Sequence, residues 1–350
     1  MRSFQLVQFG APLEAHEAPT PKPSGREVLV RIRAAGVCHS DLHICDGYYD
    51  IGHGAKLRFA DRGVKLPLTI GHEIMGEVAA LGPEAEGVKV GDRRLVYSWL
   101  GCGTCPVCRQ GDENLCTKPS FFGAFRNGGY SDYLIVPDSR YLVDVDGIPD
   151  GLAATCACAG VTAYNGVRRA GPFVKGDWLV LIGAGGVGQM GIGFAKAMTE
   201  AELLVVDLDD AKLEAARKAG VRHVLNPRQG ETAKRIVEMT GGGAMAAIDF
   251  VGATETARLA IDGVRKAGRV VIIGLYGGAL DVPLPFIPVR NLTIRGSYVG
   301  NLAETRAVVD LMRSGKVAPL PVDTRPLAEA NAALTELREG RIKGRVALTP

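Results

Sequence analysis

At 350 residues the chain exceeds the usual size of one domain, so we expect two domains, each large enough to bury a core. Its 47% hydrophobic and 23% charged residues are typical of a soluble globular protein. The net charge of +3 is nearly balanced, and no basic stripe is interleaved with aromatic residues. This pattern argues against nucleic acid as a partner.

No secretion signal or membrane span is predicted. The first residues, MRSFQLVQFG, lack the apolar core and cleavage site of a signal peptide. The uncharged run from Trp178 to Ala195 has the length of a membrane helix, but it contains six glycines and begins like a strand entering a turn. We therefore expect a cytoplasmic protein without a membrane partner. In a reducing compartment its eight cysteines favour metal binding or chemistry over disulfides.

The first 150 residues are predicted to form an irregular, mainly antiparallel β domain. Short β-like runs occur at 27–37, 94–100 and 130–136. Turn-forming segments such as PKPSG, GPEAEG and RNGG separate the runs of this region.

Beyond residue 150, strands alternate with helices. Apolar strands are predicted at 178–182, 203–209, 223–226, 246–253, 269–276 and 292–299, and helices at 189–198, 209–220, 231–239 and 254–266. This alternation predicts an α/β fold with a parallel sheet built from βαβ units. Because its strands are continuously apolar, helices should cover both faces. The tail after about residue 298 is predicted to be amphipathic helix before a final GRVALTP.

The glycine turn GAGGVG predicts a dinucleotide site. Gly183, Gly185 and Gly188 have G-x-G-x-x-G spacing, follow an apolar strand and open a helix. Such glycines let the backbone N–H groups of the turn, including those of Gly186 and Val187, approach a pyrophosphate. Asp207 ends the next strand, where a carboxylate accepts hydrogen bonds from the adenosine ribose.

Asp207 also favours NAD over NADP, because a carboxylate repels a 2′-phosphate. The next residues are Leu208, Asp209 and Asp210, with no arginine to receive that phosphate. A tight turn without a ligand, or FAD as the dinucleotide, are the alternatives.

Four closely spaced cysteines predict a structural zinc site. Cys102, Cys105, Cys108 and Cys116 form C-x2-C-x2-C-x7-C. Four thiolates suit tetrahedral zinc with no open position. An iron–sulfur run would have a last gap of three residues followed by proline, whereas the gap here is seven and Thr117 follows. A cluster or disulfides are the alternatives.

A second, dispersed group suggests an open Cys-His-Cys zinc site. GVCHSDLH supplies Cys38 and GHEIMGEV supplies His72, while a further cysteine lies near residue 157. Two thiolates and a neutral imidazole cancel the Zn²⁺ charge, whereas four thiolates leave a net charge of −2. The neutral site is the stronger Lewis acid.

The stretch TCACAG contains two cysteines, Cys156 and Cys158, of which one is expected to be the ligand. Asp150 is a plausible helix N-cap, and the alanine-rich residues that follow show no strand-like alternation. On a helix, residues i and i+2 point roughly 200° apart, so only one of the thiols can face the metal.

These motifs, in this order, resemble the medium-chain zinc-dependent alcohol dehydrogenases over essentially the whole chain. The chain looks most similar to their homotetrameric archaeal and bacterial NAD-dependent branch. The matching stretches are AAGVCHSDLH, VKLPLTIGHEIMGEV, the four-cysteine lobe, CAGVTAY, GAGGVG, GSYVGN and the terminal GRVAL.

The resemblance implies a fold and an assembly. It implies a GroES-like, mainly-β catalytic domain at 1–152 and 298–350, with a structural zinc lobe at about 99–118. It implies a Rossmann NAD-binding domain at 153–297 and a homotetramer, or else a dimer.

The resemblance also implies the roles of individual residues. Cys38, His72 and Cys158 match the catalytic zinc ligands, which leaves Cys156 as a packing residue. The family's other site residues fall at Glu73 (transient ligand), Ser40 and His43 (proton relay), Asp41 (orienting the ligand histidine), His39 and Arg345 (cofactor phosphates), Thr162 (nicotinamide), and Trp99 and Phe121 (substrate pocket).

The implied activity is reversible oxidation of primary and secondary alcohols to aldehydes and ketones, with NAD and two zinc ions per chain. The alternatives are a dehydrogenase of a polyol or of a cyclic alcohol on a carrier such as an acyl-CoA thioester, a zinc-free quinone reductase, and a non-catalytic dinucleotide sensor. A sensor has no use for a proton relay.

Two departures from the family pattern stand out. An insertion at about 46–62 carries His53, which is expected to be a solvated loop residue but can border the pocket or a subunit contact. Ser40 stands where many relatives have threonine, and the lost methyl group hints at tolerance for branched, cyclic or aromatic alcohols.

Overall fold

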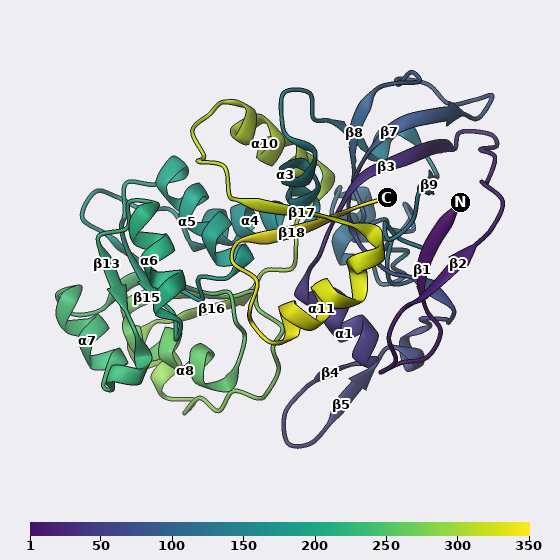
Figure 1. Cartoon of the computed structure of the whole chain (residues 1–350). Helices are drawn as coiled ribbons and strands as arrows, with labels where there is room; N and C mark the ends of the chain where they lie inside the picture. The colour runs from purple at the N-terminus through teal and green to yellow at the C-terminus, as the bar shows by residue number, and fades with distance from the viewer.

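A computed structural model describes all residues from 1 to 350. Two large sheets dominate it, one of six strands and one of seven (Figure 1). A three-stranded sheet and a two-stranded hairpin complete the β structure. The fold is the α/β arrangement predicted from the sequence.

The six-stranded sheet is wholly parallel, with the order β13-β12-β11-β14-β15-β16. Its strands are β11 (Trp178–Ile182), β12 (Glu202–Val206), β13 (His223–Leu225), β14 (Ala244–Asp249), β15 (Val264–Ile272) and β16 (Thr293–Gly296). The order reverses beside β11, so the crevice at the carboxyl end of β11 is where such sheets bind ligands.

Helices cover both faces of this sheet, as the apolar strands predicted. The helices of this region are α4 (Val161–Ala170), α5 (Gly186–Met198), α6 (Asp210–Lys218), α7 (Thr232–Met239), α8 (Thr254–Gly263) and α9 (Phe286–Arg290). Leu179 and Leu181 of β11 share one core with Phe194 of α5, whereas Val180 shares the other with Ile261 of α8. The helix predicted at 254–266 ends at Gly263, because the chain enters β15 at the next residue.

The seven-stranded sheet joins the two ends of the chain. Its path is β10-β8-β7-β3-β18-β17, and β9 also pairs with β3. The strands are β3 (Val28–Gly36), β7 (Glu73–Leu81), β8 (Arg93–Val96), β9 (Tyr133–Val136), β10 (Leu142–Asp144), β17 (Val322–Pro326) and β18 (Arg345–Thr349). Antiparallel pairing of β18 with β3 places the C-terminus beside the N-terminal half (Figure 1). The exact domain limits stay a prediction.

The remaining elements lie mostly towards the two ends of the chain. They are β1 (Arg2–Leu6), β2 (Glu14–Glu17), β6 (Leu68–Thr69), α1 (His39–Asp46), α2 (Pro106–Arg109), α10 (Leu302–Arg313), α11 (Ala330–Arg338), η2 (Glu113–Leu115), η3 (Ser139–Tyr141), η5 (Pro227–Gln229) and η6 (Leu327–Glu329). The predicted amphipathic helix of the tail thus becomes α10 and α11, separated by β17. No helix is long and apolar enough to cross a membrane.

The TCACAG region is helical, but not uniformly so. α3 (Asp150–Thr155) runs through a π-helical turn, η4 (Cys156–Gly160), into α4. π-turns often occur at functional sites. The expectation that Asp150 is the N-cap is wrong. Pro149 occupies that position, and Asp150 instead accepts a hydrogen bond from Arg93 at 2.5 Å.

The insertion forms a hairpin, β4 (Tyr48–Asp50) and β5 (Lys56–Arg58), followed by the 3-10 turn η1 (Ala60–Arg62). His53 lies exposed in the hairpin turn, as a solvated loop residue should. The hairpin also touches the six-stranded half of the molecule, because the Gly278 N–H donates to the Asp50 carbonyl at 3.4 Å.

Candidate functional site

Two groups of side chains are arranged to hold a metal ion. One is Cys102, Cys105, Cys108 and Cys116. The other is Cys38, His72, Glu73 and Cys158, all of them buried. Within each group the candidate ligand atoms lie within 4.8 Å of one another. The predicted ligands therefore meet in space, although those of the buried group come from distant parts of the chain.

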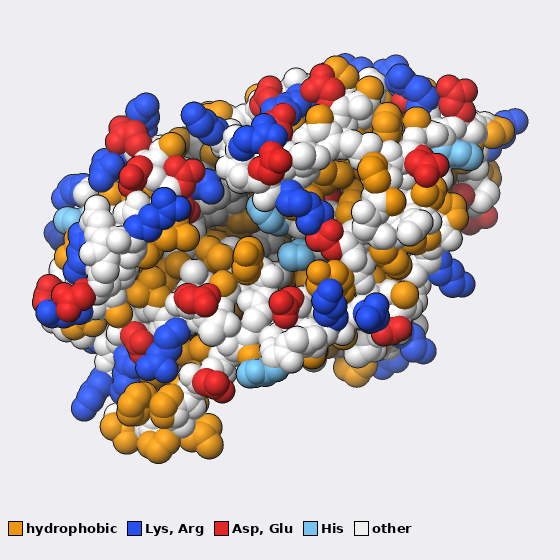
Figure 2. Space-filling view, turned by 60° about the horizontal axis from the view of Figure 1, so that its bottom comes forward, with side chains coloured by type: hydrophobic (Ala, Val, Ile, Leu, Met, Phe, Trp, Pro, Cys, Tyr) orange, Lys and Arg blue, Asp and Glu red, His pale blue; other side chains and the backbone are white.

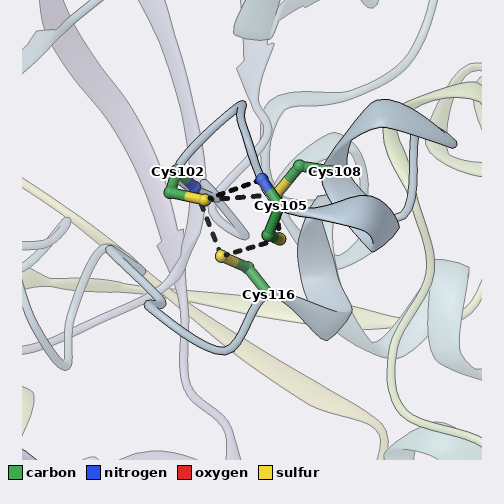
Figure 3. A group of neighbouring side chains, drawn as sticks. All are labelled: Cys102, Cys105, Cys108 and Cys116. Atoms are coloured by element: carbon green, nitrogen blue, oxygen red, sulfur yellow. Dashed lines mark hydrogen bonds between the residues drawn. The ribbon is translucent and has the colours of Figure 1, made fainter.

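The four-cysteine lobe has the dimensions of a tetrahedral thiolate site (Figure 3). Cys105 Sγ lies 3.4 Å from Cys108 Sγ and 3.8 Å from Cys116 Sγ, and Cys102 Sγ lies 4.0 Å from Cys108 Sγ. A Zn–S bond of about 2.3 Å puts the sulfurs of a regular tetrahedron about 3.8 Å apart. Disulfide sulfurs are bonded at about 2.0 Å, so these cysteines are not paired.

Local hydrogen bonds favour thiolates in this lobe. Cys102 Sγ accepts from the Thr104 hydroxyl at 3.5 Å and from the Cys105 N–H at 3.4 Å, and these contacts lower the pKa of Cys102 to about 5. Cys116 Sγ accepts from the Lys118 N–H at 3.3 Å. Thiolate character at Cys102 suits a cation. Burial raises the pKa of Cys108 to about 12, so its proton would leave only on metal binding.

The buried centre lies where β3, α1, β7 and the π-turn converge. Cys38 is the N-cap of α1, His72 precedes β7, Glu73 begins it, and Cys158 lies in the middle of η4. Cys156 Sγ instead points at the Leu152 carbonyl of its own helix, at 3.5 Å. One cysteine of TCACAG therefore joins the group, and the other packs in the core.

Asp41 fixes the orientation of His72. Its Oδ1 lies 3.0 Å from His72 Nδ1, while its Oδ2 accepts from the Cys38 N–H at 2.9 Å and from the Tyr130 hydroxyl at 3.1 Å. Because a carboxylate holds Nδ1, Nε2 is the atom left free to bind a metal ion. It is buried without a hydrogen-bond partner. Burial alone would lower the pKa of His72, but the Asp41 charge and hydrogen bond outweigh it and raise that pKa. An unpaired buried nitrogen costs free energy, which a metal ion would recover.

The two thiols of the centre share their environment. The neighbouring Cys158 thiol keeps the pKa of Cys38 well below its ordinary value, with His72 adding to the effect. The same contact, together with burial, raises the pKa of Cys158. A cation between the two sulfurs would hold both as thiolates.

Glu73 is completely buried and paired with Arg345. Arg345 Nη2 donates to Glu73 Oε2, and the Ala159 N–H donates to Oε1 at 3.2 Å. Burial raises the pKa of Glu73 to about 7, although Arg345 opposes the rise. A Cβ on Gly36 would come within 2.0 Å of Glu73 Oε2, so only glycine leaves room for this carboxylate. Arg345 balances the charge of Glu73 and leaves two thiolates and an imidazole to match a divalent cation.

A cleft of about 330 Å³ joins this centre to the glycine turn. Figure 2 shows a hollow across the middle of the molecule, with apolar and histidine side chains inside it. A Cβ on Gly188 would come within 1.9 Å of the Gly183 carbonyl oxygen, whereas one on Gly185 would meet nothing within 4 Å. The third glycine therefore permits close helix–strand packing, and the second faces open space.

Every cofactor residue predicted from the sequence lines this cleft. They are His39, Thr162, Gly183, Gly185, Gly186, Val187, Gly188, Asp207 and Arg345. Asp207 already accepts from the Ala184 N–H at 2.7 Å and the Asp209 N–H at 2.9 Å, and these bonds hold it at the rim. The Thr162 hydroxyl is buried and has no partner, which leaves it free for a ligand. Sequence reasoning missed Lys212, which lies in the first turn of α6 and lines the same cleft.

A smaller cavity of about 70 Å³ opens beside the buried centre. Trp99 and Phe121 lie there as predicted, with ring centroids 5.1 Å apart, and His72 and Ser40 line it too. Sequence reasoning missed other parts of its wall, among them Tyr49, Phe59, Arg62, Phe125 and Tyr298. These come from loops and from the insertion, where no periodic pattern marks a lining residue.

Ser40 and His43 stand three residues apart on α1 and both line the cleft. Ser40 also borders the aromatic cavity, so it touches both spaces. His43 packs against Tyr49, with ring centroids 5.0 Å apart, and burial lowers its pKa below the ordinary 6.5. A neutral imidazole at the end of this helix face can accept a proton.

The chain combines a six-stranded parallel sheet of the kind that binds nucleotides, a seven-stranded β domain and two groups of side chains arranged to hold a metal ion. Together these features define a class, the zinc-binding dehydrogenases. Residues 24–147 match the family model described as alcohol dehydrogenase GroES-like domain, and residues 186–314 match the one described as zinc-binding dehydrogenase. The chain belongs to this alcohol dehydrogenase family.

Relatives match the chain over its full length. It is 39% identical to an NAD-dependent alcohol dehydrogenase of Sulfurisphaera tokodaii, with 100% of both chains covered. It is 34% identical to D-arabinose 1-dehydrogenase (NADP(+)) of Saccharolobus solfataricus, covering 99% of this chain and 96% of that one. The crystal structure of an alcohol dehydrogenase from Aeropyrum pernix superimposes with a TM-score of 0.91 at 32% identity, with 100% of both chains covered.

Proposed function

We propose that this protein is a zinc-dependent alcohol dehydrogenase that interconverts primary or secondary alcohols with aldehydes or ketones, using NAD. The observation that carries the proposal is the unpartnered Nε2 of His72. It lies with the Cys38 and Cys158 sulfurs between the cofactor-type cleft and an aromatic cavity. Three ligands facing a cavity are typical of catalytic rather than structural zinc.

Cys38, His72 and Cys158 would hold the catalytic zinc, and Glu73 is close enough to join them. Bound zinc would supply Lewis-acid chemistry by lowering the pKa of the alcohol, and NAD would supply the hydride acceptor. Asp41 keeps His72 in the ligating tautomer through the Nδ1 contact. Burial of the whole group excludes water and strengthens its electrostatics.

The chain's own residues provide the path for the alcohol proton. Ser40 accepts it at its hydroxyl, since this side chain borders both the substrate cavity and the cleft. His43, one helical turn further on, accepts the proton next and passes it to solvent. Its lowered pKa keeps it neutral near pH 7 and ready to accept.

NAD rather than NADP is the proposed cofactor. Asp207 at the rim of the cleft repels a 2′-phosphate, and the adjoining Leu208 and Asp209 offer it no cation. Lys212 is the one basic residue near Asp207 in the cleft lining, and it can bind a ribose hydroxyl beside that carboxylate. His39 and Arg345 are the proposed phosphate contacts, and Thr162 the proposed nicotinamide contact.

The second zinc, in the four-cysteine lobe, is proposed to be structural, because all four positions are thiolates and neither the cleft nor the aromatic cavity reaches them. Self-association is also proposed, as a homotetramer or a dimer. The edge strand β16 has largely exposed residues, and the nearby Leu284 and Val289 side chains are 77% and 69% exposed. Unpaired strand edges and apolar patches of this kind are commonly covered by another chain.

The test is NADH formation by the purified protein with aliphatic, aromatic, cyclic and polyol alcohols, with NADP run in parallel. The proposal predicts turnover with NAD and two zinc ions per chain. The aromatic walls favour apolar alcohols over polyols. A clear preference for NADP would overturn the Asp207 argument. A single zinc per chain would contradict the buried site.

A further inference from the structure

The aromatic cavity beside His72 carries one permanent charge, the guanidinium of Arg62. Its other lining residues are apolar or neutral, apart from the ligand-type His72. Ring pairs make up most of the wall, including Trp99 with Tyr298 at 5.7 Å and Tyr49 with Phe59 at 4.9 Å. A cation among aromatic rings needs an explanation, because apolar cavities place their few polar groups to orient and select a ligand.

The backbone holds Arg62 in place. Its N–H donates to the Phe59 carbonyl at 3.0 Å, and the next residue, Gly63, closes the turn in the left-handed conformation at φ 91°. Phe59 itself is buried, and its N–H is tied to Gly47, directly after α1, at 2.9 Å. The short turn η1 is therefore fixed against the helix that carries Ser40 and His43.

Arg62 has no partner in the protein. It makes no ion pair and no side-chain hydrogen bond, whereas Arg338, on the neighbouring α11, binds Asp46 with both nitrogens at 2.7 and 2.9 Å. Arg62 is solvent-exposed, so it marks the open end of the cavity. His72 and Ser40 mark the inner end. The two ends of a bound molecule would thus meet different chemistry.

The charge of Arg62 reaches the cavity walls. Burial raises the pKa of Tyr49 to about 12 and also raises that of Tyr298, and in both cases the positive charge of Arg62 opposes the rise. The two tyrosines come from distant parts of the chain, one on β4 and the other after β16. The field of Arg62 therefore covers the space between them.

We propose that Arg62 selects alcohols that carry a carboxylate at the end remote from the hydroxyl, with an aromatic or similarly apolar body between the two. This inference rests on the proposed alcohol dehydrogenase activity and names its substrate class. The hydroxyl would lie at the inner end with Ser40 and His72, the body between Trp99, Phe121 and Tyr298, and the carboxylate against the guanidinium. Arginine binds a carboxylate with two parallel N–H donors, which suits this role.

The kinetic consequence is specific. The remote carboxylate keeps the same charge in the ground state and the transition state, so its contact with Arg62 is uniform binding. It should lower KM and leave kcat unchanged. Because the pair is partly exposed, we expect a preference of about five- to tenfold in kcat/KM over an uncharged analogue.

The experiment compares 4-(hydroxymethyl)benzoate with 4-(hydroxymethyl)benzamide, a neutral analogue of nearly the same shape, using the zinc-loaded protein and NAD. The ratio of their kcat/KM values is measured for the wild type, Arg62→Ala and Arg62→Lys. Arg58→Ala is the matched control, since Arg58 is an exposed arginine of the same insertion that does not line the cavity. Benzyl alcohol reports the activity itself.

We expect the wild type to prefer the benzoate through KM. Arg62→Ala should abolish the preference. Arg62→Lys should keep part of it, because lysine retains the charge but lacks the two parallel N–H donors of the guanidinium. Arg58→Ala should behave as the wild type. Added salt should weaken the preference in the wild type and have no such effect in Arg62→Ala.

Equal kcat/KM for the two substrates in the wild type, or a preference that survives Arg62→Ala, would overturn the inference and leave the alcohol dehydrogenase proposal standing. A preference carried by kcat would contradict the uniform-binding role. Failure to oxidise benzyl alcohol, the benzamide and every other alcohol would overturn the proposed function itself, and the inference with it.

Discussion

The two cysteine-containing centres differ in what surrounds their sulfurs. In the four-cysteine lobe the sulfurs accept hydrogen bonds from local N–H and O–H groups, two of the four cysteines are partly exposed, and neither the cleft nor the aromatic cavity reaches them. In the buried centre the candidate ligand atoms include both sulfur and nitrogen, and His72 Nε2 has no hydrogen-bond partner. An aromatic cavity and a cleft adjoin this centre. The type of ligand atom and the access to it, rather than the presence of cysteine, therefore separate the proposed structural site from the proposed catalytic one.

The sharpest test of this difference is removal of one ligand from the buried centre. Cys158→Ala should reduce kcat/KM by about a thousandfold or more, because the Lewis acid supplies several kcal/mol of transition-state stabilisation. Zinc content should fall from two ions per chain to one. Steady-state kinetics and metal analysis measure the two effects.

The control is Cys156→Ala, two residues away and equally buried. Its sulfur hydrogen-bonds only to the Leu152 carbonyl of its own helix, so the variant should keep both zinc ions and most of its activity. Equal losses in the two variants would contradict the distinction between ligand and packing residue.

The reverse experiment removes a ligand from the lobe. Cys105→Ser should lower the melting temperature and the zinc content while leaving the kcat of the surviving folded protein within about twofold, because structural zinc contributes folding free energy. Calorimetry and active-site-normalised kinetics distinguish the outcomes. Loss of kcat with an unchanged melting temperature would reverse the roles of the two centres.

Of the two centres, only the buried one adjoins the proton path, so only its activity should depend on the titration of His43. Burial lowers the pKa of His43, so the neutral acceptor is lost only at a pH below the ordinary histidine value of 6.5. His43→Gln should lower kcat/KM for alcohol oxidation by about a hundredfold near neutral pH and remove that acidic inflection. The deficit should shrink as pH rises, because solvent hydroxide replaces the missing base.

A pH–rate profile of His43→Gln parallel to that of the wild type would exclude His43 from the relay. The melting temperature serves as the control, since a relay residue should change the rate far more than the stability.

The smallest expected effect concerns a link between the lobe and the cavity. Asn114 Nδ2 donates to the Tyr298 carbonyl at 2.9 Å, and the Tyr298 ring forms part of the cavity wall. Asn114→Ala should raise KM about two- to fivefold with little change in kcat, because one hydrogen bond of about 1 kcal/mol is lost.

Asn331→Ala provides a matched comparison. Asn331 also ties two segments, through the N–H and carbonyl of Leu13, both at 2.9 Å, but it lies outside the cavity. It should cost stability and leave KM unchanged. Equal changes in KM would show that the Asn114 effect is general loosening.

Much of the molecule could be predicted because its signals are local. The apolar strands, the glycine turn with Asp207, and the four-cysteine spacing each lie within a short segment, so periodicity and spacing were enough. The separation of Cys158 from Cys156 followed from recognising a helix, although the π-turn itself carries no mark in the sequence.

The remainder depends on tertiary contacts. Tyr49, Arg62 and Tyr298 reach one cavity from three separate loops or short elements, and no pattern in the chain pairs them. Asp150 looked like a cap, but its carboxylate pairs with Arg93 of β8, a competing interaction that propensity cannot show. Lys212 lies on a polar face of its helix, and the sequence pattern does not show which residues of that face line the cleft.

The central claim is that the buried Cys38–His72–Cys158 centre supports NAD-dependent alcohol oxidation. The most direct measurement is the rate of NADH formation from benzyl alcohol by the wild type and by His72→Ala, at equal protein concentration and with zinc in excess. The account predicts turnover by the wild type, with one benzaldehyde formed for each NADH, and a loss of about a thousandfold or more in the variant. Equal rates in the two proteins would contradict it.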